Sequence, residues 1–214
     1  MEEVLRIAIL AAGDFPIHWR PIQALREAFF IICCDGAYRA FRNSAFNHQE
    51  FVVIGDGDSL TADEKRELGD RYIPVAEQEY NDLHKALTWV VSHFPPDTTH
   101  VTIVGATGRR EDHTLGNLAH LADFASQLPL IEMLTDHGRF TVTHGTRHFQ
   151  SHNGQQVSLF AMTPDTEVST EGLRWPIEGR KLPRWWQGTL NQALGDHFSV
   201  CGRQVLVFQA YNAV

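Results

Sequence analysis

The sequence is poor in cysteine, in long apolar runs and in positive charge. Its 214 residues include only three cysteines, Cys33, Cys34 and Cys201, and these form no CxxC pair. A sparse and odd set excludes a disulfide framework and fits a reducing compartment, so we expect a cytoplasmic protein. The N-terminus begins with acidic residues and its short apolar run is interrupted by Arg6, which does not fit a secretory signal peptide. No apolar stretch approaches the length of a membrane span, and we expect no membrane partner.

The shortage of positive charge limits the possible ligands. The chain has 18 Lys and Arg against 26 Asp and Glu, a formal net charge of -8. This excludes a broad basic face for nucleic acid. A phosphate site must then be local, built from metal ions, backbone N–H groups and a few placed Arg or Lys. The 12 histidines show no HExxH or similarly tight spacing, so no zinc site is expected.

The first two thirds of the chain alternates short apolar runs with helical patterns, which is typical of a parallel α/β layer. The strand candidates are Arg6–Ala12, Phe29–Cys34, Phe51–Ile54, Arg71–Val75, Val101–Val104 and Leu130–Leu134. The helix candidates are Pro21–Ala28, Ala37–Arg42, Ala62–Leu68, Asn81–His93 and Thr114–Ala125. In the fourth helix, Leu83, Leu87, Val90 and Phe94 recur at helical spacing and should face the sheet.

After about Gly138 the pattern changes to short strands separated by turn residues. The candidates are Phe140–His144, His148–Gln150, Val157–Met162, Thr166–Ser169, Phe198–Cys201 and Val205–Gln209. Such a series predicts a small antiparallel β-sandwich or barrel. The fold class is therefore α/β, with a mostly parallel α/β domain at residues 1–137 followed by a smaller antiparallel β-sandwich domain at residues 138–214.

The first motif with chemical potential is Val52–Leu60, an apolar strand that runs into a Gly-Asp-Gly-Asp turn. Ligands of open α/β sheets bind at the carboxyl ends of the strands. Asp56 and Asp58 emerge there and could both reach one Mg²⁺, which prefers oxygen ligands. A plain Asp-Gly turn without a ligand is the alternative.

A second acidic group lies at the start of the fourth predicted helix. Asn81 is a good N-cap and Asp82 favours the first turn, which already gives both a structural reason. Lys85, three residues on, shares a face with Asp82. The pair is either a capped helix with a surface ion pair, or a metal carboxylate beside an ammonium for phosphate.

The third motif is a glycine-rich turn, Gly105–Gly108, between a strand and a helix. Backbone N–H groups at such a turn can bind an anion, and Arg109 or Arg110 can add forked donors. The spacing is not that of a Walker A loop. Asp112 could be only an N-cap, and Asn117 only an ordinary surface residue.

The fourth motif is Asp35-Gly36 at a third strand end, where Asp35 is either another N-cap or a ligand-binding residue. Three strand ends that all finish in Asp/Gly turns favour a shared site over three unrelated turns.

Together these motifs resemble the thiamin pyrophosphokinase family, nearly from end to end. The matching segments are Gly13–Pro16, Cys33–Gly36, Gly55–Ser59, Gln78 with Asp82 and Lys85, Gly105–Asn117, Val157–Leu159, Glu171–Pro176 and Gly188–Asn191. The resemblance implies transfer of diphosphate from ATP to the hydroxyl of thiamin, with AMP as leaving group. It also implies a homodimer, with thiamin bound between the α/β domain of one subunit and the β-sandwich of its partner.

For that reaction, Asp56, Asp58 and Asp82 are the expected Mg²⁺ ligands. The catalytic set adds Lys85 and Arg110, which would offset phosphate charge, and Asp112, which would orient or deprotonate the hydroxyl. The expected nucleotide-binding residues are Asp35, Gln78, Lys85, Thr107 and Arg110, and the expected thiamin-binding residues are Asp112, Trp175 and Asn191.

Three positions depart from the family pattern. Gly57 stands where a larger residue is usual, so we expect a looser loop; Arg109 stands where a glycine is common; and Leu190 stands where a serine often precedes the asparagine. Two alternatives remain open: a pyrophosphokinase for another alcohol, such as a hydroxymethyl pterin, and a non-catalytic module that binds thiamin or a nucleotide. Trp175, Trp185 and Trp186 could each stack on a cationic thiazolium, or could serve only in core or interface packing.

Overall fold

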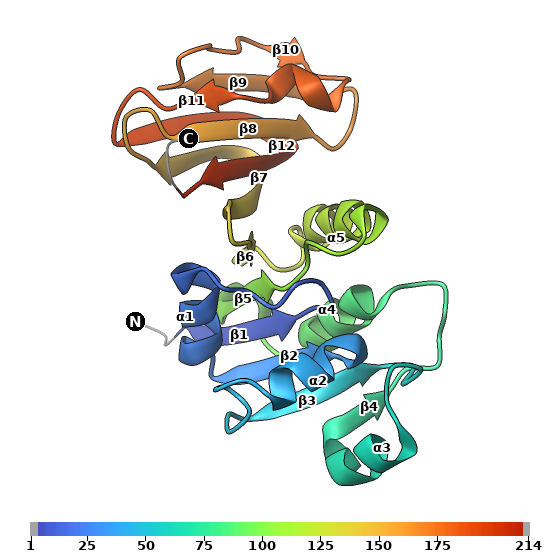
Figure 1. Ribbon diagram of the computed structural model, residues 1–214. Helices are drawn as coiled ribbons and strands as arrows, with labels where there is room; N and C mark the ends of the chain where they lie inside the picture. Colours follow the sequence, from blue (N-terminus) through green and yellow to red (C-terminus); the bar gives the residue numbers. More distant parts are fainter. Residues whose placement is uncertain (1–3, 212–214) are drawn as a thin grey trace. The chain divides into compact units, whose positions relative to one another are not determined.

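The computed structural model describes residues 4–211 and divides into two compact units (Figure 1). The first unit comprises Met1–His120 and Gln127–Asp136, and the second comprises Leu121–Ser126 and His137–Val214. The short segment Leu121–Ser126 thus groups with the second unit. The assignment of separate functions to domains 1–137 and 138–214 stays a prediction.

The first unit is built on a parallel sheet. Its strands are β1 (Leu5–Leu10), β2 (Phe30–Cys34), β3 (Phe51–Gly55), β4 (Tyr72–Pro74), β5 (Thr99–Val104) and β6 (Ile131–Leu134). The parallel pairings give the order β4-β3-β2-β1-β5-β6. The chain therefore adds strands on one side of β1 and then on the other, which places the topological switch point between β1 and β5.

Continuous apolar runs explain these strands. Ile7, Ile9, Ile32, Ile54 and Ile103 are almost completely inaccessible to solvent. Strands of a parallel sheet are covered on both faces, so they need apolar side chains on both sides. The predicted strands of this part are all present, with ends shifted by a few residues.

Helices connect these strands: α1 (Trp19–Glu27), α2 (Tyr38–Arg42), α3 (Ala62–Leu68), α4 (Asp82–His93) and α5 (Glu111–Phe124). Short 3₁₀ turns lie at Asp35–Ala37, Gly69–Arg71, Pro96–Thr98 and Trp185–Gly188. A capping box between Thr61 and Glu64 starts α3. In α4, Leu83, Leu87 and Val90 are buried, which confirms the predicted apolar face. Among residues 4–211, no helix is both long and apolar enough to span a membrane.

The second unit is antiparallel, as expected. Its strands are β7 (Gly138–Gln150), β8 (Gln156–Ala161), β9 (Glu167–Glu171), β10 (Arg180–Lys181), β11 (Asn191–Gln192) and β12 (His197–Ala210). The four short strands predicted within β7 and β12 are wrong as separate elements, because each pair forms one long strand. The sequence pattern breaks at the bulge between Arg203 and Val205, where Gln204 has a φ of 53°. On one side of this bulge β12 pairs with β9, and on the other with β8.

Candidate active site

A pocket of about 570 Å³ lies at the carboxyl ends of β1, β2, β3 and β5, beside the switch point. Its wall comes from the loops that follow these strands and from the start of α4. The sequence favoured a shared site for the turns at three strand ends, and the loops after β2, β3 and β5 do line one pocket, together with the loop after β1. The polar and charged lining includes Asp35, Asp56, Asp58, Asp82, Lys85, Gln78, Arg109, Arg110, His113 and Asn117.

Three carboxylates meet in this pocket. Oxygens of Asp35, Asp56 and Asp58 lie within 4.8 Å of one another. Asp35 is buried; its Oδ2 accepts a bond of 2.8 Å from the N–H of Gly57, while its Oδ1 has no hydrogen-bond partner among the described residues. An orphaned buried oxygen beside two further carboxylates fits a hard divalent cation such as Mg²⁺.

The electrostatics of Asp35 are consistent with such a fit. Burial, followed by the neighbouring Asp82 carboxylate, raises the pKa of Asp35 from 3.8 to about 7, against the opposing effect of the Gly57 N–H. Asp58 adds a smaller repulsion. Packed carboxylates of this kind repel one another unless a proton or a cation compensates their charge.

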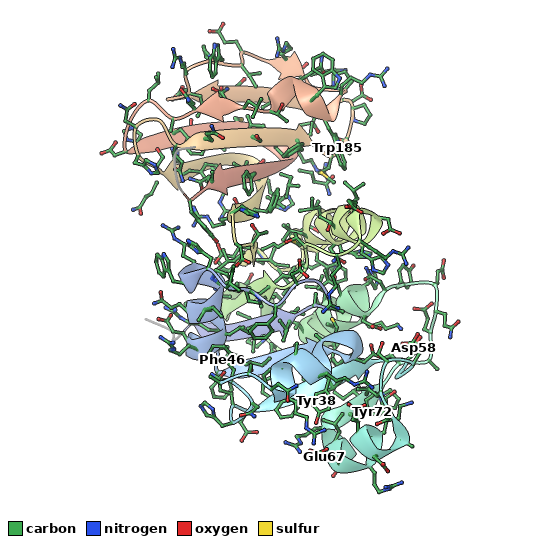
Figure 2. All side chains as sticks on the ribbon, in the orientation of Figure 1. Tyr38, Phe46, Asp58, Glu67, Tyr72 and Trp185 are labelled. Atoms are coloured by element: carbon green, nitrogen blue, oxygen red, sulfur yellow. The ribbon has the colours of Figure 1, made fainter. Side chains whose placement is uncertain are left out.

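Two features favour glycine at position 57, the centre of the carboxylate turn. Its φ is +80°, which favours glycine, and a Cβ placed there would overlap the hydroxyl of Tyr72 and lie 2.7 Å from Nζ of Lys65. Figure 2 labels Asp58, on the loop after β3, and Tyr72, on β4. The ends of the Tyr72 and Lys65 side chains occupy the space that a larger residue 57 would need. The expectation of a looser loop stays a prediction.

The start of α4 supplies an ion pair to the same pocket. Asn81 caps the helix by accepting from the N–H of His84, as predicted. Lys85 Nζ lies 3.2 Å from Asp82 Oδ1, and the Lys85 side chain is only 4% exposed. Burial alone would lower the pKa of Lys85, but Asp82 and the nearby Asp56 outweigh it and raise that pKa. Lys85 therefore stays a cation, and Asp82 both pairs with it and neighbours Asp35.

Asn117 is a positioning residue, although its sequence position also allowed an ordinary surface role. It is buried, its Oδ1 accepts from Nδ2 of Asn81 at 3.0 Å, and its Nδ2 donates to the carbonyl of Ala106 at 2.8 Å. It thus joins the start of α4 to the loop after β5. Its position four residues before the buried Leu121, on one helix face, is the signal that could have identified it.

The loops after β1 and β5 are held together by backbone hydrogen bonds. The N–H of Gly13 donates to Gly105 at 2.7 Å, and that of Asp14 donates to Thr107 at 2.9 Å. Thr107 therefore contributes its carbonyl to loop packing and is not among the residues that line the pocket. Its predicted role in nucleotide binding stays a prediction.

Arg110 and Asp112 bind each other. Nε and Nη2 of Arg110 donate to the two Asp112 oxygens at 3.1 and 2.5 Å, and both side chains are exposed. The Arg110 guanidinium lowers the pKa of Asp112, which makes this carboxylate a weaker base. Asp112 does not line the pocket, whereas Arg110 and the exposed Gln78 do.

The second unit has its own hollow of about 390 Å³, lined by Trp175, Leu190 and Asn191 among others. Asn191 is buried; its Oδ1 accepts from the N–H of Trp175 and its Nδ2 donates to the Trp175 carbonyl at 2.7 Å. Asn191 therefore holds the backbone of Trp175, a residue that is 53% exposed. Leu190 adopts a φ of 61° and is largely exposed.

The protein is therefore a two-unit α/β protein. Its first unit is a parallel α/β layer with carboxylates and cations at the switch point, and its second unit is an antiparallel β structure. Within that class, residues 22–131 match the description "Thiamin pyrophosphokinase, catalytic domain" and residues 138–208 match "Thiamin pyrophosphokinase, substrate-binding domain". The chain belongs to the thiamin pyrophosphokinase family.

Individual relatives agree with that membership. The chain is 27% identical over 143 residues to thiamine pyrophosphokinase 1 of Oryza sativa subsp. japonica, covering 61% of this chain and 54% of the relative. It is 36% identical over 70 residues to thiamine pyrophosphokinase of Bacillus subtilis (strain 168), covering 31% of each. The matches thus span about half or less of these curated relatives.

Similarity to solved structures covers nearly the whole chain. The crystal structure of thiamine pyrophosphokinase from Bacillus subtilis superposes with a TM-score of 0.76 at 19% identity, over 97% of this chain and 99% of the other. At this identity the match establishes the fold, a mixed α/β chain with an antiparallel C-terminal part.

Proposed function

We propose that this protein transfers diphosphate from ATP to the hydroxyl of thiamin and releases AMP. The observation that carries the proposal is the pocket at the switch point, where the carboxylates of Asp35, Asp56 and Asp58 share a wall with Lys85 and Arg110. Membership of the thiamin pyrophosphokinase family supplies the substrate class. The two alternatives, a pterin pyrophosphokinase and a non-catalytic module, are not favoured by any of these matches.

In this reaction the hydroxyl oxygen of thiamin forms a bond to the β-phosphorus of ATP. The bond between the β-phosphorus and the oxygen that bridges it to the α-phosphorus breaks. AMP keeps that oxygen, and the hydroxyl proton is released. Negative charge around the phosphorus opposes the attack, so catalysis depends mainly on positioning and on charge neutralisation. The buried Lys85 ammonium, fixed by Asp82, supports a role in neutralising the transferred diphosphate.

The carboxylates also fit the magnesium that the family resemblance implies. Asp56 and Asp58 would hold the ion, and Asp35 is an additional candidate ligand because of its orphaned Oδ1. When bound, Mg²⁺ would supply neutralisation of phosphate charge. Asp82 as a third ligand stays a prediction; it would have to share its carboxylate with Lys85.

Arg110 and Asp112 keep their proposed roles. The two bonds to Asp112 leave three of the five N–H donors of Arg110 for the nucleotide. Asp112 would still have to offer an oxygen to the thiamin hydroxyl beside Arg110. Gln78, Thr107 and Asp35 remain proposed nucleotide-binding residues.

For thiamin, the exposed ring of Trp175 offers a face for a cationic thiazolium, a contact worth roughly 0.5–2 kcal/mol. Asn191 would act by holding Trp175. A homodimer that shares this site, and a cytoplasmic location, stay predictions from the sequence.

The test is incubation with ATP, Mg²⁺ and thiamin, with the products separated by chromatography. AMP should appear one-for-one with thiamin diphosphate. ADP that accumulates with thiamin monophosphate would mean ordinary kinase chemistry, and turnover of a hydroxymethyl pterin in place of thiamin would identify the alternative. Binding without any product would indicate the non-catalytic module.

A further inference from the structure

Arg109 combines an unfavourable backbone conformation with a place on the wall of the pocket. Its φ is 56°, the left-handed region in which residues other than glycine are uncommon. Residues held in such conformations concentrate at sites where the side chain has a function. Gly105 and Gly108 in the same loop also adopt positive φ. Because glycine has no Cβ, a glycine at position 109 would adopt the φ of 56° without strain.

The charges on the pocket wall distinguish Arg109 from its neighbours. Within the described part of the chain, the Lys and Arg residues on this wall are Lys85, Arg109 and Arg110. Lys85 is paired with Asp82 at 3.2 Å, and Arg110 donates twice to Asp112. Arg109 makes a looser approach of 3.7 Å between its Nε and Oδ1 of Asp14. Its guanidinium is thus the least neutralised of the three.

The side chain of Arg109 is also anchored. Its Nη1 donates to the carbonyl of Ala12 at 3.0 Å, across the two loops that are already joined by the Gly13 and Asp14 backbone bonds. Ala12 and Gly13 line the pocket beside Arg109. Because a guanidinium has five N–H donors, this anchor leaves several donors for another acceptor. The side chain is 57% exposed, so those donors are accessible.

We propose that Arg109 binds a phosphate oxygen of the nucleotide. The proposal rests on the proposed function, since it needs a nucleotide in this pocket. Four carboxylates, of Asp35, Asp56, Asp58 and Asp82, line the same pocket, so a bound polyphosphate gains from positive charge beyond that of Lys85, Arg110 and Mg²⁺. An anchored guanidinium matches the paired oxygens of a phosphate and gives a charge-assisted contact.

The experiment measures the dissociation constant of α,β-methylene-ATP with Mg²⁺, because this analogue has no cleavable bridge between the α- and β-phosphorus. Arg109→Gly keeps the positive φ and removes the guanidinium. It should raise the dissociation constant about tenfold, which corresponds to about 1.4 kcal/mol. Arg109→Lys should weaken binding less. Arg66→Ala, an exposed position on α3, removes the same charge away from the pocket and should have no effect.

A second variant separates a phosphate contact of Arg109 from its ion pair with Asp14, which also links the two loops. Asp14→Asn removes the charge opposite Arg109 but leaves the guanidinium, so it should leave binding unchanged or tighten it. If Asp14→Asn weakens binding as much as Arg109→Gly, Arg109 acts by joining the loops and the proposal is overturned. Equal dissociation constants for wild type and Arg109→Gly would overturn it as well, with the proposed function intact. If wild type binds no analogue, the proposed function fails and this proposal fails with it.

Discussion

The Gly57→Ala variant offers a quantitative test of how the carboxylate turn is held. Gly57 has a φ of +80°, and an alanine held in that conformation would lose about 1–2 kcal/mol of folding free energy. The added Cβ would in addition overlap Tyr72 Oη and lie 2.7 Å from both Cε and Nζ of Lys65. Overpacking of this size costs about 1–3 kcal/mol. We therefore expect a total loss of roughly 2–5 kcal/mol in the free energy of unfolding.

A matched control isolates the packing contribution. Gly154 has a φ of +82°, and no described atom outside its own chain neighbours lies within 4 Å of the place where a Cβ would stand. Gly154→Ala should therefore lose only the backbone cost. The double variant Gly57→Ala with Tyr72→Phe removes the nearest overlapping atom and should recover part of the loss. Lys65 has a flexible side chain and should move aside.

The assays are urea denaturation, thermal unfolding and a Mg²⁺ titration of each folded variant. Each 1 kcal/mol corresponds to about 2–4 °C in the unfolding temperature for a chain of this size. Mg²⁺ affinity should fall in Gly57→Ala, because Asp56 and Asp58 flank the displaced residue, and recover in the double variant. If Gly57→Ala loses no more stability than Gly154→Ala, Tyr72 and Lys65 do not fix the turn and the reasoning is refuted.

The site supports three further predictions. Asp56→Asn, Asp58→Asn and Asp82→Asn should each fold and lose turnover roughly 10²–10³-fold; near-normal rates in any two would contradict the metal site. Because burial raises the pKa of Asp35 to about 7, the folded chain without metal binds a proton that the unfolded chain releases, so stability should fall as pH rises from about 3.8 to about 7. Asp35→Asn should flatten that dependence in denaturation curves, and an unchanged slope would assign it to other groups. For a shared site in a homodimer, mixing Asp82→Asn with Asn191→Ala should restore activity after subunit exchange, and no recovery would place the site within one chain.

Sequence pattern alone predicted the parallel strands and the turns that follow them. Short apolar runs such as Ile31–Cys34, bounded by turn residues, indicate buried strands. Asp-Gly pairs end strands because their backbone favours turns. The same reasoning placed Asp82 and Lys85 on one helix face, since helical spacing fixes which neighbours meet. Local rules failed for β7 and β12, which were each predicted as two strands; in β12 a bulge interrupts the alternation without ending the strand.

What only the tertiary structure decided is which side chains from different strands meet. β2 lies next to β3, which brings Asp35 against Asp56 and Asp58, and no local pattern contains that order of strands. The bridge through Asn117 depends on how α5 approaches α4, because Asn117 and Asn81 are 36 residues apart. The sequence by itself determined the elements and the residue types at the strand ends, because those depend on near neighbours. Tertiary packing decided their partners and charges, because both depend on groups that are distant in the chain.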